Sequence, residues 1–160
     1  MPPGYFLGSL VAIGVLRLLA PTAVLSGPGL LWGGGLLVGL GLVLNVLGVS
    51  RFERTGTPVR PGSRSTRLST SGVFAISRNP MYLGLVLALG GFGLGLGTLP
   101  GMLVPAAFVG LINRQFIRHE EALLLQQFGD DYLRYQARVG RWLRPLRPRS
   151  SRAATGPIGR

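Results

Sequence analysis

The sequence contains no cysteine and no lysine, and it has one histidine and five acidic residues among 160 residues. Without cysteine the chain has no disulfide framework, thiolate nucleophile or cysteine-ligated metal site. One histidine, His119, and five carboxylates leave few ligands for a metal centre and argue against a Ser-His-Asp triad. We therefore expect neither a metal site nor a histidine-dependent hydrolase.

Charge is also scarce. Charged residues make up 14% of the chain and hydrophobic residues 47%, with a mean hydropathy of +0.41. Soluble domains average about 25% charged residues, so these values disfavour both a disordered chain and an ordinary soluble domain. The length predicts one domain, which we place at residues 1–145, followed by a basic flexible tail at 146–160.

The charge that is present is unevenly distributed. Residues 1–50 contain one charged side chain, Arg17, and residues 79–113 contain none. All 17 basic residues are arginine, and most lie beside these uncharged segments rather than along one polar face. The net charge of +12 therefore indicates a membrane protein with basic cytoplasmic loops, and we expect no nucleic-acid partner.

The uncharged segments predict an all-α fold, a polytopic membrane bundle of about four transmembrane helices with C-terminal cytosolic helices. A helix needs about 20 apolar residues to cross the bilayer, and the 21 residues Gly29–Val49 meet this need most clearly. Arg17, in the first segment, either snorkels to the interface or faces the bundle interior. The expected helices lie near 5–25, 29–49, 81–96, 102–128 and 130–140.

The segment 97–101 breaks the third apolar region into a tight helical hairpin, whose arms either span the bilayer or re-enter it. The arginine distribution places the 50–80 loop and both termini in the cytoplasm. The expected location is a bacterial-type inner or plasma membrane. Within the spans, Gly35-x3-Gly39 and Gly91-x3-Gly95 have the spacing of close helix packing.

A third helix starts at Asn79-Pro80, with Asn79 placed as its cap and Pro80 in its first turn. Near the C-terminus, Gly129 ends one helix, and a second begins at Asp130. Apolar spacing puts Glu121 on, or beside, the apolar face of the first of these helices. The second carries the stripe Tyr132, Tyr135, Gln136 and Val139, which we interpret as an amphipathic face on the membrane surface.

Glu120 and Glu121 allow two interpretations. Either they pair with Arg114 and Arg118 on their own helix, or they belong to a functional site.

Two motifs resemble those of a known family. The run Ser77-Arg78-Asn79-Pro80-Met81-Tyr82-Leu83-Gly84 resembles the R-H/N-P-x-Y-x-G motif of the isoprenylcysteine carboxyl methyltransferase family and its phospholipid methyltransferase relatives. The pattern from Glu120-Glu121 through Phe128-Gly129, Tyr132 and Tyr135 to Arg141-Trp142-Leu143 is similar to that family's C-terminal pattern. Together they cover roughly residues 50–145.

The resemblance implies an integral membrane enzyme that uses S-adenosylmethionine, without a Rossmann fold or a metal. The chain departs from the best-known members at Asn79, where they have histidine; asparagine still donates and accepts hydrogen bonds. Arg78, Tyr135 and Arg141 match positions of the family's motifs. The residues that the resemblance assigns to cofactor binding are Asn79, Pro80, Tyr82, Gly84, Glu120, Glu121 and Tyr132.

The expected function is methyl transfer to a lipophilic small-molecule or lipidated acceptor, with membrane lipids as surroundings. A carboxylate acceptor is favoured because it is already ionised and needs no general base. Arg78 or Arg141 would hold it as catalytic residues, and Glu121 would pair with the amino group of the cofactor. Tyr82 would contact the sulfonium or adenine region, or serve as an interfacial belt residue.

Two other functions remain open from the sequence. One is a non-catalytic small membrane protein whose arginine-rich loops bind anionic lipid or a partner protein. The other is a reductase of lipid double bonds.

Overall fold

The computed structural model describes residues 2–20, 25, 27–54 and 68–143, and within this part it is helical, with no β-strand. The predicted all-α class is confirmed. The basic tail expected at 146–160 lies outside the described residues. The elements are α1 (Pro2–Leu19), α2 (Pro28–Arg54), η1 (Gly72–Ala75), α3 (Pro80–Gly95), η2 (Pro100–Leu103), α4 (Val104–Ile112), η3 (Asn113–Ile117) and α5 (Arg118–Arg138).

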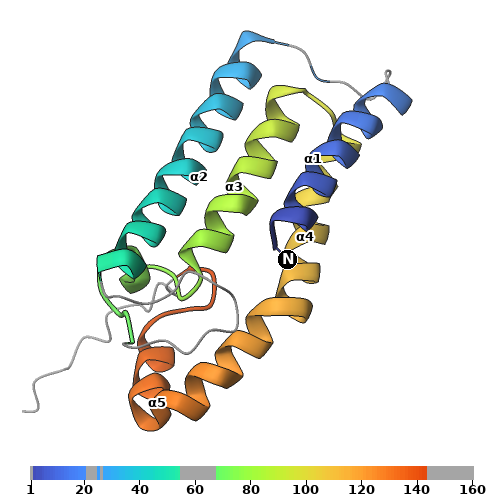
Figure 1. Ribbon diagram of the computed structural model, residues 1–160. Coiled ribbons are helices and arrows are strands. Elements are labelled where there is room, and N and C mark those ends of the chain that lie inside the picture. The colour runs from blue at the N-terminus through green and yellow to red at the C-terminus, as the bar shows by residue number, and fades with distance from the viewer. Residues whose placement is uncertain (1, 21–24, 26, 55–67, 144–160) are drawn as a thin grey trace, which may run out of the picture.

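The first four α-helices lie side by side, and consecutive helices run in opposite directions (Figure 1). The start of α1, the end of α2, the start of α3 and the end of α4 therefore meet at one end of the bundle. From that end α5 projects away and then turns back (Figure 1). This end of the bundle gathers both sequence motifs.

One helix in the described part, between Pro28 and Arg51, is long and apolar enough to cross a membrane; the apolar helices Pro3–Leu19 and Pro80–Gly95 are shorter. The outer faces of α1 and α2 expose large apolar side chains, including Leu18 at 78% and Trp32 at 79%. A soluble monomer rarely exposes a broad apolar surface, whereas lipid covers one at no penalty. The four-span topology and the cytoplasmic termini stay predictions.

Helices α2 and α3 approach most closely at glycines. A Cβ atom added to Gly34 would lie 2.5 Å from the carbonyl oxygen of Gly91, and one added to Gly84 would lie 2.5 Å from that of Gly41. The contact therefore repeats every seven residues, two helical turns, along both antiparallel helices. The prediction for the 35–39 pair was wrong, because an added Cβ at either position meets no atom within 4 Å.

The first helix ends earlier than the expected residue 25. It stops at Leu19, because a proline at position 21 disfavours helical geometry at Ala20. Arg17 faces the bundle, and its Nε donates a hydrogen bond to the carbonyl oxygen of Leu96, 3.2 Å away. This carbonyl lies at the C-terminal end of α3, where a cation is favourable.

The helix expected over 102–128 is interrupted by the π-helical turn η3 between α4 and α5. Phe108, Ile112, Ile117 and Glu121 are all buried, at spacings of four, five and four residues. The hydrogen bonds of a π turn span one more residue than those of an α-helix, which accounts for the five-residue spacing between Ile112 and Ile117. The buried residues therefore form one continuous stripe from the bundle into α5. Glu121 thereby extends the stripe that packs inside the bundle.

Gly129 breaks α5 in the middle, as predicted. Its φ of 47° is a conformation that favours glycine, and it lets the second half of α5 fold back toward the start of α3. The returning half carries the second motif to the first.

Candidate functional site

Backbone and side-chain hydrogen bonds join the two motifs directly. The backbone N–H of Arg78 donates to the carbonyl oxygen of Gly140 at 3.0 Å. The carbonyl oxygen of Arg141 accepts hydrogen bonds from Ser77 Oγ at 3.3 Å and from Asn79 Nδ2 at 3.1 Å. The segment after α5 is thus fixed against the segment before α3.

Asn79 has a different local role from the one predicted. It occupies the residue before α3, but its side chain makes no capping hydrogen bond because its amide donates to Arg141 instead. Pro80 occupies the first turn of α3, as predicted.

Two arginines share the carboxylate of Glu121. Arg78 Nη1 lies 3.1 Å from Glu121 Oε1, and Arg141 Nε donates to the same oxygen at 3.0 Å while its Nη2 pairs with Oε2. The side chains of Glu121 and Arg78 are 11% and 12% exposed, and that of Arg141 is 35% exposed. The hydrogen bonds to Glu121 raise the pKa of Arg141, so it stays charged.

The intrahelical alternative for the acidic pair was therefore wrong for Glu121, because its partners come from other segments. Arg78 Nε and Nη1 are buried and have no hydrogen-bond acceptor among the described residues, although Nη1 lies within ion-pair distance of Glu121. A buried guanidinium with a free donor is suited to receive an anionic ligand group.

Glu120 has a different environment from its neighbour. It accepts a hydrogen bond from the Tyr82 hydroxyl at 3.0 Å, and within the described part of the chain it forms no ion pair. Burial raises the pKa of the Glu120 carboxyl above its usual value, and the hydrogen bond from Tyr82 and the nearby His119 offset part of that rise. Tyr82 therefore points into the site instead of outward as a belt residue.

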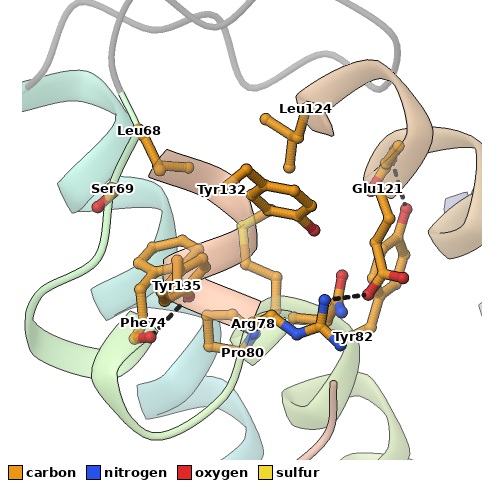
Figure 2. Close-up of a pocket in the computed structure, with 13 residues that line it drawn as sticks. Leu68, Ser69, Phe74, Arg78, Pro80, Tyr82, Glu121, Leu124, Tyr132 and Tyr135 are labelled. Atoms are coloured by element: carbon orange, nitrogen blue, oxygen red, sulfur yellow. Dashed lines mark hydrogen bonds and ion pairs between the residues drawn. The ribbon is translucent and has the colours of Figure 1, made fainter. Parts of the chain in front are cut away.

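Two tyrosines from the returning half of α5 form an aromatic wall (Figure 2). Tyr132 and Tyr135 are 1% and 3% exposed, and the Tyr135 hydroxyl donates to the carbonyl oxygen of Phe74 at 2.7 Å. Burial raises the pKa of both phenols, so both hydroxyls stay protonated. The interpretation of this stripe as a membrane-surface face was wrong, because Leu68, Leu124 and Phe128 pack against it.

These groups surround one pocket. Figure 2 shows Arg78, from the segment before α3, and Glu121 and Tyr132, from the two halves of α5, pointing toward the same space. The lining includes seven of the predicted site residues: Arg78, Asn79, Pro80, Tyr82, Glu120, Glu121 and Tyr132. The remaining lining residues are Leu68, Ser69, Phe74, Met81, Leu124 and Tyr135.

Two predicted residues lie elsewhere. Arg141 is not part of the lining, but it contacts the Glu121 carboxylate that is. Gly84 faces Gly41 and Asn45 of α2, and this close packing accounts for the absence of a side chain. Its role in cofactor binding stays a prediction.

Sequence reasoning missed several contributors. Ser77, 1% exposed, ties the two motifs together, and its place in the motif was the only signal for it. Leu68 and Phe74 precede the motif and carry no distinguishing pattern. Across the described residues, no group of three or more histidine, aspartate or glutamate side chains is arranged to hold a metal ion.

A sequence profile described as phospholipid methyltransferase matches residues 30–131 of the chain. The chain belongs to the phospholipid methyltransferase family. The matched region contains the Arg78–Gly84 motif and the acidic pair, and it extends into the returning half of α5. Family membership indicates a membrane-associated methyltransferase.

The chain is also similar to an uncharacterized protein of Haemophilus influenzae (strain ATCC 51907 / DSM 11121 / KW20 / Rd). The two are 43% identical over 63 residues, which are 39% of this chain and the whole of the relative. None of the solved structures matches the chain.

Proposed function

We propose that this member of the family is an integral membrane methyltransferase that uses S-adenosylmethionine to methylate a carboxylate on a lipophilic acceptor. The observation that supports it is the convergence of both motifs on one pocket, where cationic, acidic and aromatic side chains face the same space. A protein that only anchors to anionic lipid has no need for this arrangement.

The pocket suits S-adenosylmethionine in its chemistry. The methionyl part of this cofactor carries a carboxylate and an ammonium, its sulfur is cationic, and its adenine is a flat aromatic ring. Arg78, whose buried Nε has no partner among the described residues, would bind the carboxylate. Tyr132 and Phe74 offer aromatic surface for the adenine.

The roles of the two acidic residues follow from their partners. Both oxygens of Glu121 contact arginines, so Glu121 holds Arg78 and Arg141 in position. Glu120 has no cationic partner in the described part and is open to a positively charged group of the cofactor. The ammonium contact expected of Glu121 is therefore disfavoured, because its carboxylate is already shared by two arginines.

The bound cofactor supplies an electrophilic methyl group, and the protein supplies binding, orientation and exclusion of water. Proximity alone contributes up to about 7–11 kcal/mol in favourable cases. A carboxylate acceptor requires no proton acceptor, in agreement with a site whose nearest histidine, His119, is exposed. Arg141, one-third exposed beside the pocket, would hold such a carboxylate at the membrane edge.

The test uses detergent-purified protein, methyl-labelled S-adenosylmethionine and a total membrane lipid extract. We expect label to enter the lipid-soluble fraction and to be released by mild base as methanol, because methyl esters hydrolyse and methylamines do not. Glu121→Ala should abolish transfer, whereas Asp131→Asn, which changes an exposed carboxylate that is not part of the lining, should preserve it.

The outcomes separate the alternatives. Base-stable label in a lipid amine would replace the carboxylate acceptor with an amine and keep the methyltransferase. Neither transfer nor binding of S-adenosylmethionine at millimolar concentration would refute the proposed function.

A further inference from the structure

We propose that Glu120 makes the pocket selective for the cationic, methylated form of the cofactor over the neutral thioether that remains after methyl transfer. This inference rests on the proposed function and assigns a product-release role to one residue of that site. Glu120 is the specificity-determining carboxylate, and Tyr82 holds it in place.

The first argument is the contrast between the two adjacent carboxylates. Glu121 is neutralised by Arg78 and Arg141, so it presents little net charge to a ligand. Glu120 also lines the pocket, but its described polar partner is the neutral hydroxyl of Tyr82. The negative charge of Glu120 is therefore the one that a cation entering the pocket meets unpaired.

The second argument is the change of charge during the reaction. When the methyl group moves to the acceptor oxygen, the electrons of the S–CH₃ bond stay on sulfur, and the sulfonium becomes a neutral thioether. The carboxylate and ammonium of the methionyl part are the same before and after. An unpaired carboxylate in a partly dehydrated pocket therefore attracts the reactant more strongly than the product.

The third argument is burial. The Glu120 carboxyl lies in a partly buried position where its pKa is raised, so ionisation is unfavourable without a cation nearby. A ligand that supplies the missing positive charge relieves this penalty. A neutral ligand does not.

The test measures dissociation constants of purified protein for S-adenosylmethionine and for S-adenosylhomocysteine. Glu120→Gln keeps an oxygen that accepts the Tyr82 hydrogen bond and removes the charge. We expect it to weaken binding of S-adenosylmethionine about tenfold, or ~1.4 kcal/mol, and to leave binding of S-adenosylhomocysteine within about twofold. Asp130→Asn, an exposed carboxylate on the same helix, is the matched control and should change neither constant.

A second measurement needs no variant. In the wild-type protein, the affinity for S-adenosylmethionine divided by the affinity for S-adenosylhomocysteine should rise with pH as Glu120 ionises. This rise should occur above pH 4.5, the ordinary pKa of a glutamate carboxyl. Groups common to both ligands cancel in this ratio. The titratable or charged protein groups nearby are Tyr82 on α3, Arg78 before it, His119 and Glu121 on α5, and Tyr132 on its returning half.

Equal weakening of both ligands by Glu120→Gln would show that Glu120 contacts the shared ammonium, and would overturn the inference while the proposed function stands. No weakening of either ligand, or a ratio that does not change with pH, would overturn it as well. If the wild-type protein binds neither ligand, the proposed function itself fails.

Discussion

The contact between α2 and α3 allows a sharp test, because two neighbouring glycines in α3 face opposite environments. A Cβ atom added to Gly91 would lie 2.5 Å from the Gly34 carbonyl oxygen, 2.8 Å from the Val38 nitrogen and 2.9 Å from the Leu37 Cβ. A Cβ added to Gly90 would meet no atom within 4 Å. Gly91→Ala and Gly90→Ala therefore make the same chemical change one residue apart.

The two substitutions should change the free energy of unfolding in opposite directions. At Gly91 the backbone of α2 must move away, and overpacking of this kind costs about 1–3 kcal/mol. At Gly90 the substitution changes only helix propensity, which favours alanine by up to about 1 kcal/mol. The gain in helix propensity is the same at both positions, so the two variants should differ by the overpacking cost, about 1–3 kcal/mol in the free energy of unfolding. For a chain of this length that corresponds to roughly 3–9 °C in Tm.

The assay is thermal unfolding of both variants in the same detergent, followed by circular dichroism at 222 nm. Gly91→Ala should unfold below the wild-type protein, and Gly90→Ala at or above it. Equal midpoints for the two variants would refute the close approach of α2 and α3. A lower midpoint for Gly90→Ala alone would show that the face of α3 that carries Gly90, and not the face that carries Gly91, packs against α2.

Three further predictions concern the site. Glu121→Gln leaves two arginines without their shared carboxylate and should lower the free energy of unfolding by about 2 kcal/mol, as measured by Tm in detergent. The loss is smaller than for breaking a fully buried ion pair, because Arg141 is one-third exposed. Tyr135→Phe removes the donor to the Phe74 carbonyl oxygen and should cost about 1–2 kcal/mol, whereas Tyr5→Phe, at an exposed position, should cost less than 0.5 kcal/mol. Because the folded-state pKa of Glu120 is raised, the protonated Glu120 side chain stabilises the fold at acid pH, and this stabilisation is lost as pH rises above about 4.5. The Tm of Glu120→Gln relative to the wild-type protein should therefore increase over that range.

Each of these has a contrary result. Additive effects of Glu121→Gln and Arg78→Met in a double-mutant cycle would show that these two side chains do not interact. Equal losses for the two tyrosine variants would mean that the buried hydrogen bond contributes nothing. A Tm difference for Glu120→Gln that is constant with pH would contradict the raised pKa.

The helical class and most of the chemical groups of the site could be predicted from the sequence alone. The uncharged runs predicted the all-α class, and Asn79-Pro80 and Gly129 marked the start of α3 and the break in α5. These signals are local: proline and glycine act through backbone geometry, and apolar length acts through the preference for a nonpolar surrounding. The resemblance in two motifs likewise named most of the residues that line the pocket.

Which of these groups meet depends on how the helices pack in three dimensions. The pairing of Glu121 with Arg78 and Arg141, and the isolation of Glu120 beside Tyr82, depend on the π turn and on the fold-back at Gly129. Helical spacing alone offered Glu121 partners on its own helix, and it left the tyrosine stripe facing a membrane. Neither could be corrected from sequence, because a contact between residues far apart in the chain depends on how the intervening helices pack, and spacing within a helix records only its own neighbours.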